Sequence, residues 1–116
     1  MGLDVHAKGM QDYYIGYGRY YQMRREIVLQ AYGERCLTIF DSVRNSEDDI
    51  AYWNSVCNDD LDIFLLHSDC DGKFTPQECR KILKALDDVH VESTILDQWR
   101  KMFKYCADRR VNMYYC

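Results

Sequence analysis

Apolar residues recur at helical spacing between residues 17 and 32. They fall at every third or fourth position and so share one face of a helix: Tyr20, Met23, Ile27 and Ala31. Gly33 follows the last of them and is a typical helix stop. The pattern predicts an amphipathic helix over residues 17–32. The next apolar run, residues 36–43, is too short to assign to a helix or a strand.

Four later positions carry helix start signals. Ser46 precedes three acidic residues, and Asn58 precedes two. Thr75 is followed by a proline and, at its third helical position, by Glu78, which is a capping box. Ser93 or Thr94 starts the last helix. The expected apolar faces are Ile50, Trp53 and Val56; then Leu61, Phe64 and Leu65; then Cys79, Ile82, Leu83 and Leu86; and finally Ile95, Trp99, Met102, Phe103 and Cys106.

The two ends of the chain differ from this helical pattern. Residues 2–6 alternate weakly, which indicates a short strand, and the apolar tail 111–116 is expected to pack back onto the body. A chain of 116 residues has room for one domain. We therefore predict one globular domain over residues 1–116. Its fold class is mainly α, a compact bundle of four to six helices with a short N-terminal β element.

Composition and cysteine spacing indicate the cellular compartment in which the protein works. With 47% hydrophobic residues the chain is globular, and no apolar run approaches the ~18 residues of a membrane span. No basic-then-apolar leader opens it, so we expect a soluble cytoplasmic protein without membrane contact. Its six cysteines form no Cys-x-x-Cys pair, which argues against a structural zinc site. We expect free thiols.

Residues 67–78 match most of a calcium-binding EF-hand loop. The pattern requires oxygen ligands at set positions, glycine at the sixth and an apolar residue at the eighth. Gly72 and Phe74 stand at those two places. The candidate ligands are His67, Asp69, Asp71, Lys73 through its carbonyl, Thr75 and Glu78. His67 departs from the pattern, because imidazole is a poor ligand for calcium. No second such loop is present.

The same residues also fit ordinary turn chemistry. Aspartates bond nearby amides, glycine takes a positive φ, and the capping box already accounts for Glu78. We expect a loop held by its own hydrogen bonds and no required cofactor, with calcium binding as the alternative.

Several segments resemble a group of small bacterial and bacteriophage proteins. The chain opens Met-Gly-Leu-Asp-Val, continues with the aromatic and arginine-rich stretch 17–25, and carries a Leu-Leu-His-Ser-Asp-Cys-Asp-Gly block at residues 65–72. These segments make up about a third of the chain, and the block is the most specific of them. The resemblance implies a phage or mobile-element protein that works in the cytoplasm of a bacterial host cell.

Charge is unevenly distributed. Residues 41–71 hold nine acidic residues against one basic residue, Arg44, a net charge of −8 within a chain of net charge −4. An acidic chain is not expected to bind nucleic acid directly. The segment predicts a surface that steers toward a basic partner, through residues such as Asp48, Asp49, Asp59 and Asp60. The alternative is that these acids only serve helix starts and a turn.

Tyrosine is abundant, with ten residues, five of them near the N-terminus. Tyrosine and arginine are enriched at protein interfaces, and Arg19, Arg24 and Arg25 lie nearby. The second set of candidate binding residues is Tyr13, Tyr14, Tyr17, Tyr20 and Tyr21. The alternative places most of these rings in the core with their hydroxyls at its rim.

No catalytic motif is evident, so we expect a protein that is not an enzyme. There is no nucleophile elbow, phosphate-binding glycine loop or His-Glu-x-x-His sequence. The leading hypothesis is a phage-type protein-binding module, in its sharpest form an anti-CRISPR-like inhibitor of a nucleic-acid-handling host defence complex. Its partner would be a host protein with a basic surface. An EF-hand-like calcium-binding module and a small metal-dependent hydrolase are the two alternatives.

Overall fold

A small antiparallel sheet closes one end of the molecule. The computed structural model describes residues 1–116 and begins with β1 (Gly2–His6) and β2 (Tyr13–Gly16) as a hairpin. The last strand, β4 (Met113–Tyr115), pairs with β1 on one side and β3 (Lys73–Phe74) on the other, so the strand order is β2-β1-β4-β3. The prediction that the tail packs back is therefore confirmed. The sheet extends well beyond the single predicted strand.

Six helices make up most of the chain, which confirms the mainly α fold class. They are α1 (Tyr17–Tyr32), α2 (Glu34–Asp41), α3 (Glu47–Val56), α4 (Asp59–Leu65), α5 (Pro76–Leu86) and α6 (Thr94–Arg109). The capping box predicted at Thr75 is present, and the helix start predicted at Ser46 is also a capping box. Ser46 and Thr75 each accept a bond from the backbone three residues on. The ambiguous run 36–43 lies mostly in α2.

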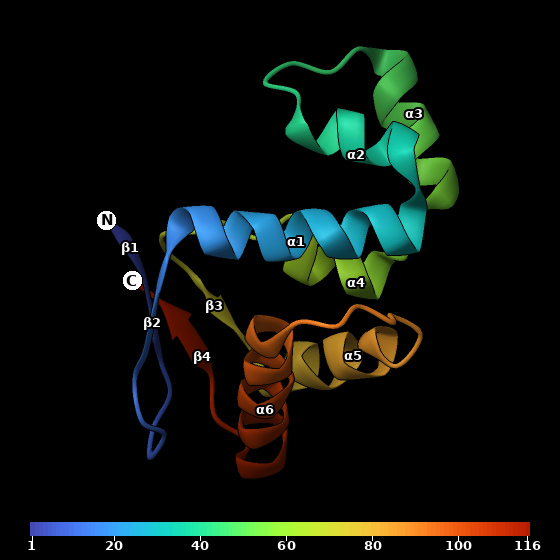
Figure 1. Ribbon diagram of the computed structural model, residues 1–116. Coiled ribbons are helices and arrows are strands. Elements are labelled where there is room, and N and C mark those ends of the chain that lie inside the picture. The colour runs from blue at the N-terminus through green and yellow to red at the C-terminus, as the bar shows by residue number, and fades with distance from the viewer.

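Helix α1 divides the molecule. In Figure 1 it crosses the middle, α2 and α3 stand above it, and α4, α5 and α6 lie below, with the sheet at its N-terminal end. The buried core contains 27 apolar residues. Its largest fully buried side chains include Trp99, Tyr20 and Phe64, drawn from three helices. The core therefore ties α1 to α4, α6 and the sheet.

Some predicted core positions are on the surface instead. Ala31 is exposed at the end of α1, and Ile50 and Val56 are exposed on α3. The buried face of α1 includes Arg24 and Val28, which the apolar spacing did not assign to it. Helix α3 touches few other elements, and only Trp53 on it is buried. Tyr52 on α3 is half-buried, with the Arg35 guanidinium 3.8 Å from the centre of its ring, and most of the remaining side chains of α3 are exposed.

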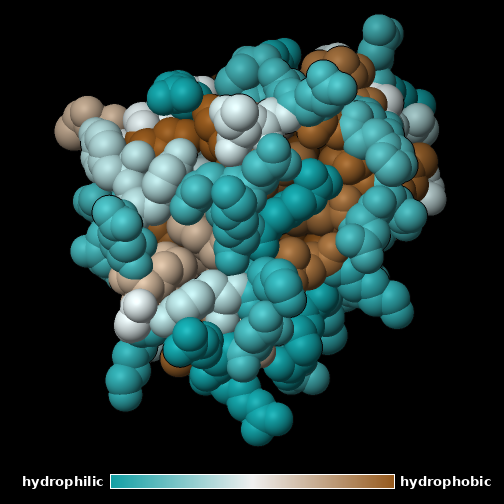
Figure 2. Space-filling view, turned by 60° about the horizontal axis from the view of Figure 1, so that its bottom comes forward, coloured by the Kyte–Doolittle hydropathy of each residue, from teal (hydrophilic) through white to brown (hydrophobic).

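Polar side chains cover most of the face shown in Figure 2, and apolar atoms gather toward its upper right. No helix combines the length and the apolar character needed to cross a bilayer.

Candidate functional site

The imidazole of His67 fills the interior of the predicted calcium loop. Its Nδ1 lies 2.7 Å from the carbonyl oxygen of Ser68, and its Nε2 lies 3.1 Å from that of Lys73. The ring stacks on Phe74 with centroids 4.1 Å apart. A Cβ built on Gly72, which has φ 89°, would lie 3.0 Å from the His67 ring. Glycine therefore permits both the turn and the close approach of the ring.

This geometry uses the Lys73 carbonyl, one of the predicted metal ligands, as a partner for the ring. A neutral imidazole carries one N–H and can donate to only one of the two carbonyls, whereas the doubly protonated ring donates to both. The ring thus stands where an EF-hand loop holds its cation and engages the Lys73 carbonyl there.

The other candidate ligands do not converge. Glu78 Oε1 accepts from the Thr75 amide at 2.9 Å, and Thr75 Oγ1 accepts from the Glu78 amide at 3.1 Å. Asp69 is half-buried and Asp71 is exposed, and neither forms an ion pair. No group of three or more His, Cys, Asp or Glu side chains is placed to hold a metal ion. The loop matches most of the EF-hand pattern in sequence, but its side-chain oxygens do not come together.

A buried arginine, Arg24, donates hydrogen bonds to the backbone at the start of this loop. Sequence reasoning did not assign it to the interior. Arg24 is 6% exposed, and its Nη1 donates to the carbonyls of Leu65 at 3.1 Å and His67 at 3.4 Å. Its guanidinium lies 4.4 Å from the centre of the Tyr20 ring, and its Nε has no partner. A cation at the carboxyl end of α4 complements the negative end of the helix dipole.

Two of the five candidate tyrosines pack into the protein and are not part of an exposed cluster. Tyr20 is fully buried, and its hydroxyl lies 2.7 Å from the hydroxyl of Tyr115. Tyr13 is half-buried and packs edge-on against Trp99 with centroids 5.5 Å apart. The prediction that Tyr20 contacts a partner was wrong, because it faces the core side of α1.

The remaining three tyrosines reach solvent in separate places. Tyr17 is half-buried at the start of α1. Tyr14 is exposed on β2, while Tyr21 is exposed on α1 and its hydroxyl donates to Asp41 on α2. The predicted aromatic cluster is therefore dispersed, and only Tyr21 lies beside α2.

The acidic segment is divided between carboxylates with partners and carboxylates without. Asp41 is paired with Arg25, and Asp62 accepts from Trp53 Nε1 at 2.9 Å and from the Tyr32 hydroxyl at 2.7 Å. Burial raises the pKa of Asp62, and its two hydrogen bonds act in the opposite direction. These two acids serve the fold.

The four predicted docking acids form no ion pair. Asp48 and Asp59 are exposed, while Asp49 and Asp60 are half-buried. Asp49 also accepts from the Ser46 amide at 3.3 Å as part of the capping box of α3. Asp49 therefore has a structural role. Asp59 accepts a hydrogen bond from Cys57 Sγ at 3.4 Å, and the exposed Asp48 is the freest of the four.

Asp59 and Asp60 lie at the start of α4, beside the carboxyl end of α1, whereas Asp48 and Asp49 lie at the start of α3, the end of that helix away from α1. Helix α3 lies on one side of α1 and α4 on the other, and the Tyr32 hydroxyl bonds to both the amide and the carbonyl of Asn58 between them (Figure 1). No basic residue lies in the last turn of α1, so its carbonyl end adds to the negative potential there. Negative charge from the first turn of α4 and from the α1 terminus is thereby combined at this place.

An apolar groove of about 320 Å³ lies between α2 and α3, and sequence reasoning did not identify it. Its apolar lining consists of Ile39, Phe40, Ile50, Trp53 and Leu66. The only sequence signal was the apolar spacing of α2 and α3, which was assigned wholly to the core. The groove forms because α3 buries only one of its apolar side chains.

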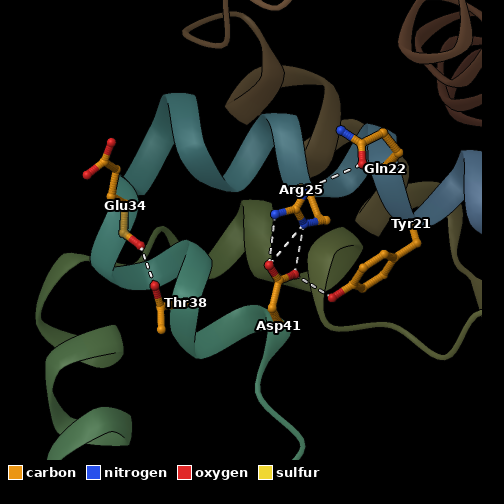
Figure 3. A network of polar contacts seen from close by, with 6 residues as sticks. All are labelled: Tyr21, Gln22, Arg25, Glu34, Thr38 and Asp41. Atoms are coloured by element: carbon orange, nitrogen blue, oxygen red, sulfur yellow. Dashed lines mark hydrogen bonds and ion pairs between the residues drawn. The ribbon is translucent and has the colours of Figure 1, made fainter.

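Helix α2, which forms one wall of this groove, is fastened to α1 by Asp41. Arg25 donates to it with Nε and Nη2, each at 2.9 Å, and Tyr21 donates its hydroxyl (Figure 3). The hydrogen bonds from Arg25 and Tyr21 lower the pKa of Asp41. The two parallel hydrogen bonds from Arg25 fix the orientation of the Asp41 carboxylate as well as its distance from α1.

Comparison with known proteins gives no match for this chain, whether by family model, by sequence or by fold.

Proposed function

We propose that the protein is a non-catalytic binding module that docks on a basic surface of another protein through the exposed acids of its segment 41–71. The observation that carries the proposal is the set of exposed carboxylates without ion-pair partners, Asp48 and Asp59 foremost, in a segment of net charge −8. Unpaired like charges destabilise a folded chain slightly, and their gain comes when an oppositely charged surface meets them.

The partner of this surface is a protein that normally handles nucleic acid. Its basic site attracts phosphate and would attract these carboxylates by the same field. The resemblance to bacterial and phage proteins supports a sharper form of the proposal. In that form the module is anti-CRISPR-like, works in the bacterial cytoplasm and inhibits a host defence complex by covering its nucleic-acid site. The module itself binds neither nucleic acid nor a membrane.

The test begins with affinity capture from a bacterial lysate and identification of the partner by mass spectrometry. Association rates are then measured by surface plasmon resonance at several salt concentrations. The variant is Asp48→Lys/Asp59→Lys, which spares the capping carboxylate of Asp49. The matched control is Asp12→Lys/Asp108→Lys, an equal charge change at exposed acids in the β1–β2 connection and the last turn of α6, whose partners are the solvent-accessible His6 and Lys104 side chains.

We expect the Asp48/Asp59 variant to associate about tenfold more slowly at low salt, and the difference to fade as salt screens the field. The Asp12/Asp108 control should associate much as the parent chain does. Nucleic acid should compete for the partner. Equal association rates for the two variants at low salt would mean that the acids serve only helix starts and turns.

A further inference from the structure

The groove between α2 and α3 is lined without any charged side chain, although it lies in the most acidic part of the chain. Its lining consists of five apolar residues and of three polar, uncharged residues, Ser42, Asn45 and Asn54. All of these except Ile39 and Phe40 belong to residues 41–71, which carry a net charge of −8. An uncharged lining in such a segment requires that the neighbouring carboxylates be held elsewhere.

Three acids near the groove are each held by hydrogen bonds within the protein. The carboxylate of Asp41 is paired with Arg25 on α1 (Figure 3). That of Asp49 accepts from a backbone amide in the capping box of α3. That of Asp62 accepts from Nε1 of Trp53 at 2.9 Å. None of the three lines the groove, so its interior stays free of charge.

The apolar walls combine ordered aromatic rings with aliphatic side chains that are open to solvent. The Phe40 ring stacks on that of Tyr21, with centroids 5.5 Å apart, and on that of Trp53, with centroids 6.3 Å apart. Ile50 is 52% exposed and Leu66 is 60% exposed. A bound apolar group would cover these two side chains, and the rings beside them are already in place. Walls that need little further ordering favour affinity.

The hydrogen-bonding groups that the groove offers a ligand are neutral. The Ser42 hydroxyl already donates to the carbonyl oxygen of Arg44 at 2.6 Å. Asn45 and Asn54 are exposed, and an asparagine carboxamide can both donate and accept. A ligand with one neutral polar group, such as an amide, can therefore bond there. A carboxylate or an ammonium group would lose water without meeting an opposite charge.

We propose that this groove is a binding site for an uncharged, mainly aromatic small molecule of about two fused rings that carries one neutral polar group. A cavity of about 150 Å³ holds benzene, and this groove measures about 320 Å³. The aromatic walls at Phe40 and Trp53 favour an aromatic ligand, because rings gain from edge and offset contacts beyond the area that they bury. The site goes beyond the proposed docking function and does not depend on it.

The test uses the whole protein labelled with ¹⁵N and three naphthalene derivatives of similar shape. At neutral pH, 2-naphthamide is uncharged, 2-naphthoate is an anion and 2-naphthylmethylamine is a cation. We expect 2-naphthamide to shift the indole N–H signal of Trp53 and the backbone amide signals of Ile50 and Leu66, with a dissociation constant in the millimolar range or tighter. Both charged relatives should bind at least about tenfold more weakly in the groove.

Two variants locate the binding. Ile50→Ser removes an exposed wall side chain and should weaken 2-naphthamide about tenfold, the loss expected when an apolar contact of this size is removed. Leu29→Ser makes the same kind of change at an exposed position on α1 outside the groove, and should leave the affinity unchanged. Circular dichroism verifies that both variants fold.

Three results would overturn the inference. The first is the absence of shifts at Trp53, Ile50 and Leu66 in a saturated solution of 2-naphthamide. The second is equal or tighter binding of either charged relative at the groove signals. The third is an Ile50→Ser variant that binds 2-naphthamide as well as Leu29→Ser does. The proposed function is decided separately, by the association rates of the lysine variants.

Discussion

Three side chains meet by their polar atoms in the interior between α1, α6 and β4. The Tyr115 hydroxyl accepts from Trp99 Nε1 at 2.9 Å and lies 2.7 Å from the Tyr20 hydroxyl. Burial raises the pKa of Tyr20 to about 12, so these hydroxyls stay protonated throughout the range in which proteins fold. Tyr115 is the shared partner, because it contacts both of the others.

The hydroxyls of Tyr20 and Tyr115 therefore contribute different amounts to the free energy of unfolding. Tyr115→Phe leaves the buried Trp99 N–H and the Tyr20 hydroxyl without partners, and should reduce the free energy of unfolding by about 2 kcal/mol. Tyr20→Phe leaves the bond between Trp99 and Tyr115 in place and should cost about 1 kcal/mol. Guanidinium unfolding of the two variants measures both values. The network is described wrongly if Tyr20→Phe proves the more destabilising change.

The His67 ring occupies space and uses an oxygen that a cation would need. His67→Asp removes the ring, frees the Lys73 carbonyl and adds a carboxylate at the first loop position. We expect this variant to bind calcium at least about tenfold more tightly than the parent chain, because affinity in such loops follows the number of charged oxygen ligands. Isothermal titration with calcium chloride is the measurement.

His67→Asn is the matched control for this change, since it removes the ring to a similar degree without adding charge. It should gain much less calcium affinity than His67→Asp. Equal affinities for the two variants would show that the fixed pairing of Glu78 with Thr75, and not the histidine, keeps calcium from the loop.

At the scale of elements, the attachment of α2 to α1 depends on the ionised form of Asp41. Asp41→Asn should reduce the free energy of unfolding by about 1 kcal/mol at neutral pH, the upper range for a partly exposed ion pair. The folded-state pKa of Asp41 is lowered from its ordinary value of 3.8, so this contribution is present above that value. It is lost as the pH falls through the lower folded-state value.

The pH profile checks this prediction. Denaturant unfolding of the parent chain and of Asp41→Asn should differ at pH 7 and converge as the pH falls below about 4. A difference that persists undiminished at the lowest pH would mean that the substitution disturbs packing instead of removing a charge contact.

The helices could be predicted because their signals are local. The capping residues Ser46 and Thr75 act within three positions of themselves, and Gly33 ends α1 where the apolar spacing stops. The strands had no comparable signal. β3 has two residues, and its Lys73 pairs with Tyr114. Pairing between segments that distant in sequence is decided by the tertiary fold and leaves no period in so short a run.

The residues of the candidate site also divide into those that local sequence signals could predict and those whose placement depends on the tertiary fold. The exposure of Asp48 and Asp59 followed from residue type and position at helix starts. The groove did not, because it depends on α3 leaving Ile50 uncovered, and spacing alone makes Ile50 look like a core residue. Arg24 was grouped with the surface arginines, whereas its burial depends on the carbonyl end of α4 lying against α1.

At the scale of the whole molecule, charge and apolar exposure lie close together. The acidic segment passes around the carboxyl end of α1, and the groove opens between α2 and α3 on the upper side of α1 in Figure 1. Asp48 of the acidic segment and Ile50 of the groove lie within one turn of each other on α3, on different faces of the helix. A partner steered by the acids would thus arrive beside the groove, and a ligand held there would lie at the edge of the contact.

The distribution of thiols gives a test of the fold as a whole. All six cysteines are free in the structure, as the sequence predicted. Cys70 and Cys116 are exposed, Cys57 is half-buried, and Cys36, Cys79 and Cys106 are buried. Burial raises the pKa of Cys36, and the neighbouring Cys106 together with burial raises that of Cys79, which lowers thiolate reactivity further.

Titration of the native protein with an aromatic disulfide reagent should therefore give three classes of thiol. Cys70 and Cys116 should react at once and Cys57 more slowly, whereas Cys36, Cys79 and Cys106 should react only as fast as the protein unfolds, because the interior of α1, α2, α5 and α6 excludes the reagent. Denatured, unreduced and anaerobically prepared protein should show all six. A denatured count of four would reveal a disulfide. Rapid reaction of Cys79 and Cys106 in the native state would mean that the contact between α5 and α6 opens far more readily than a core of this kind should.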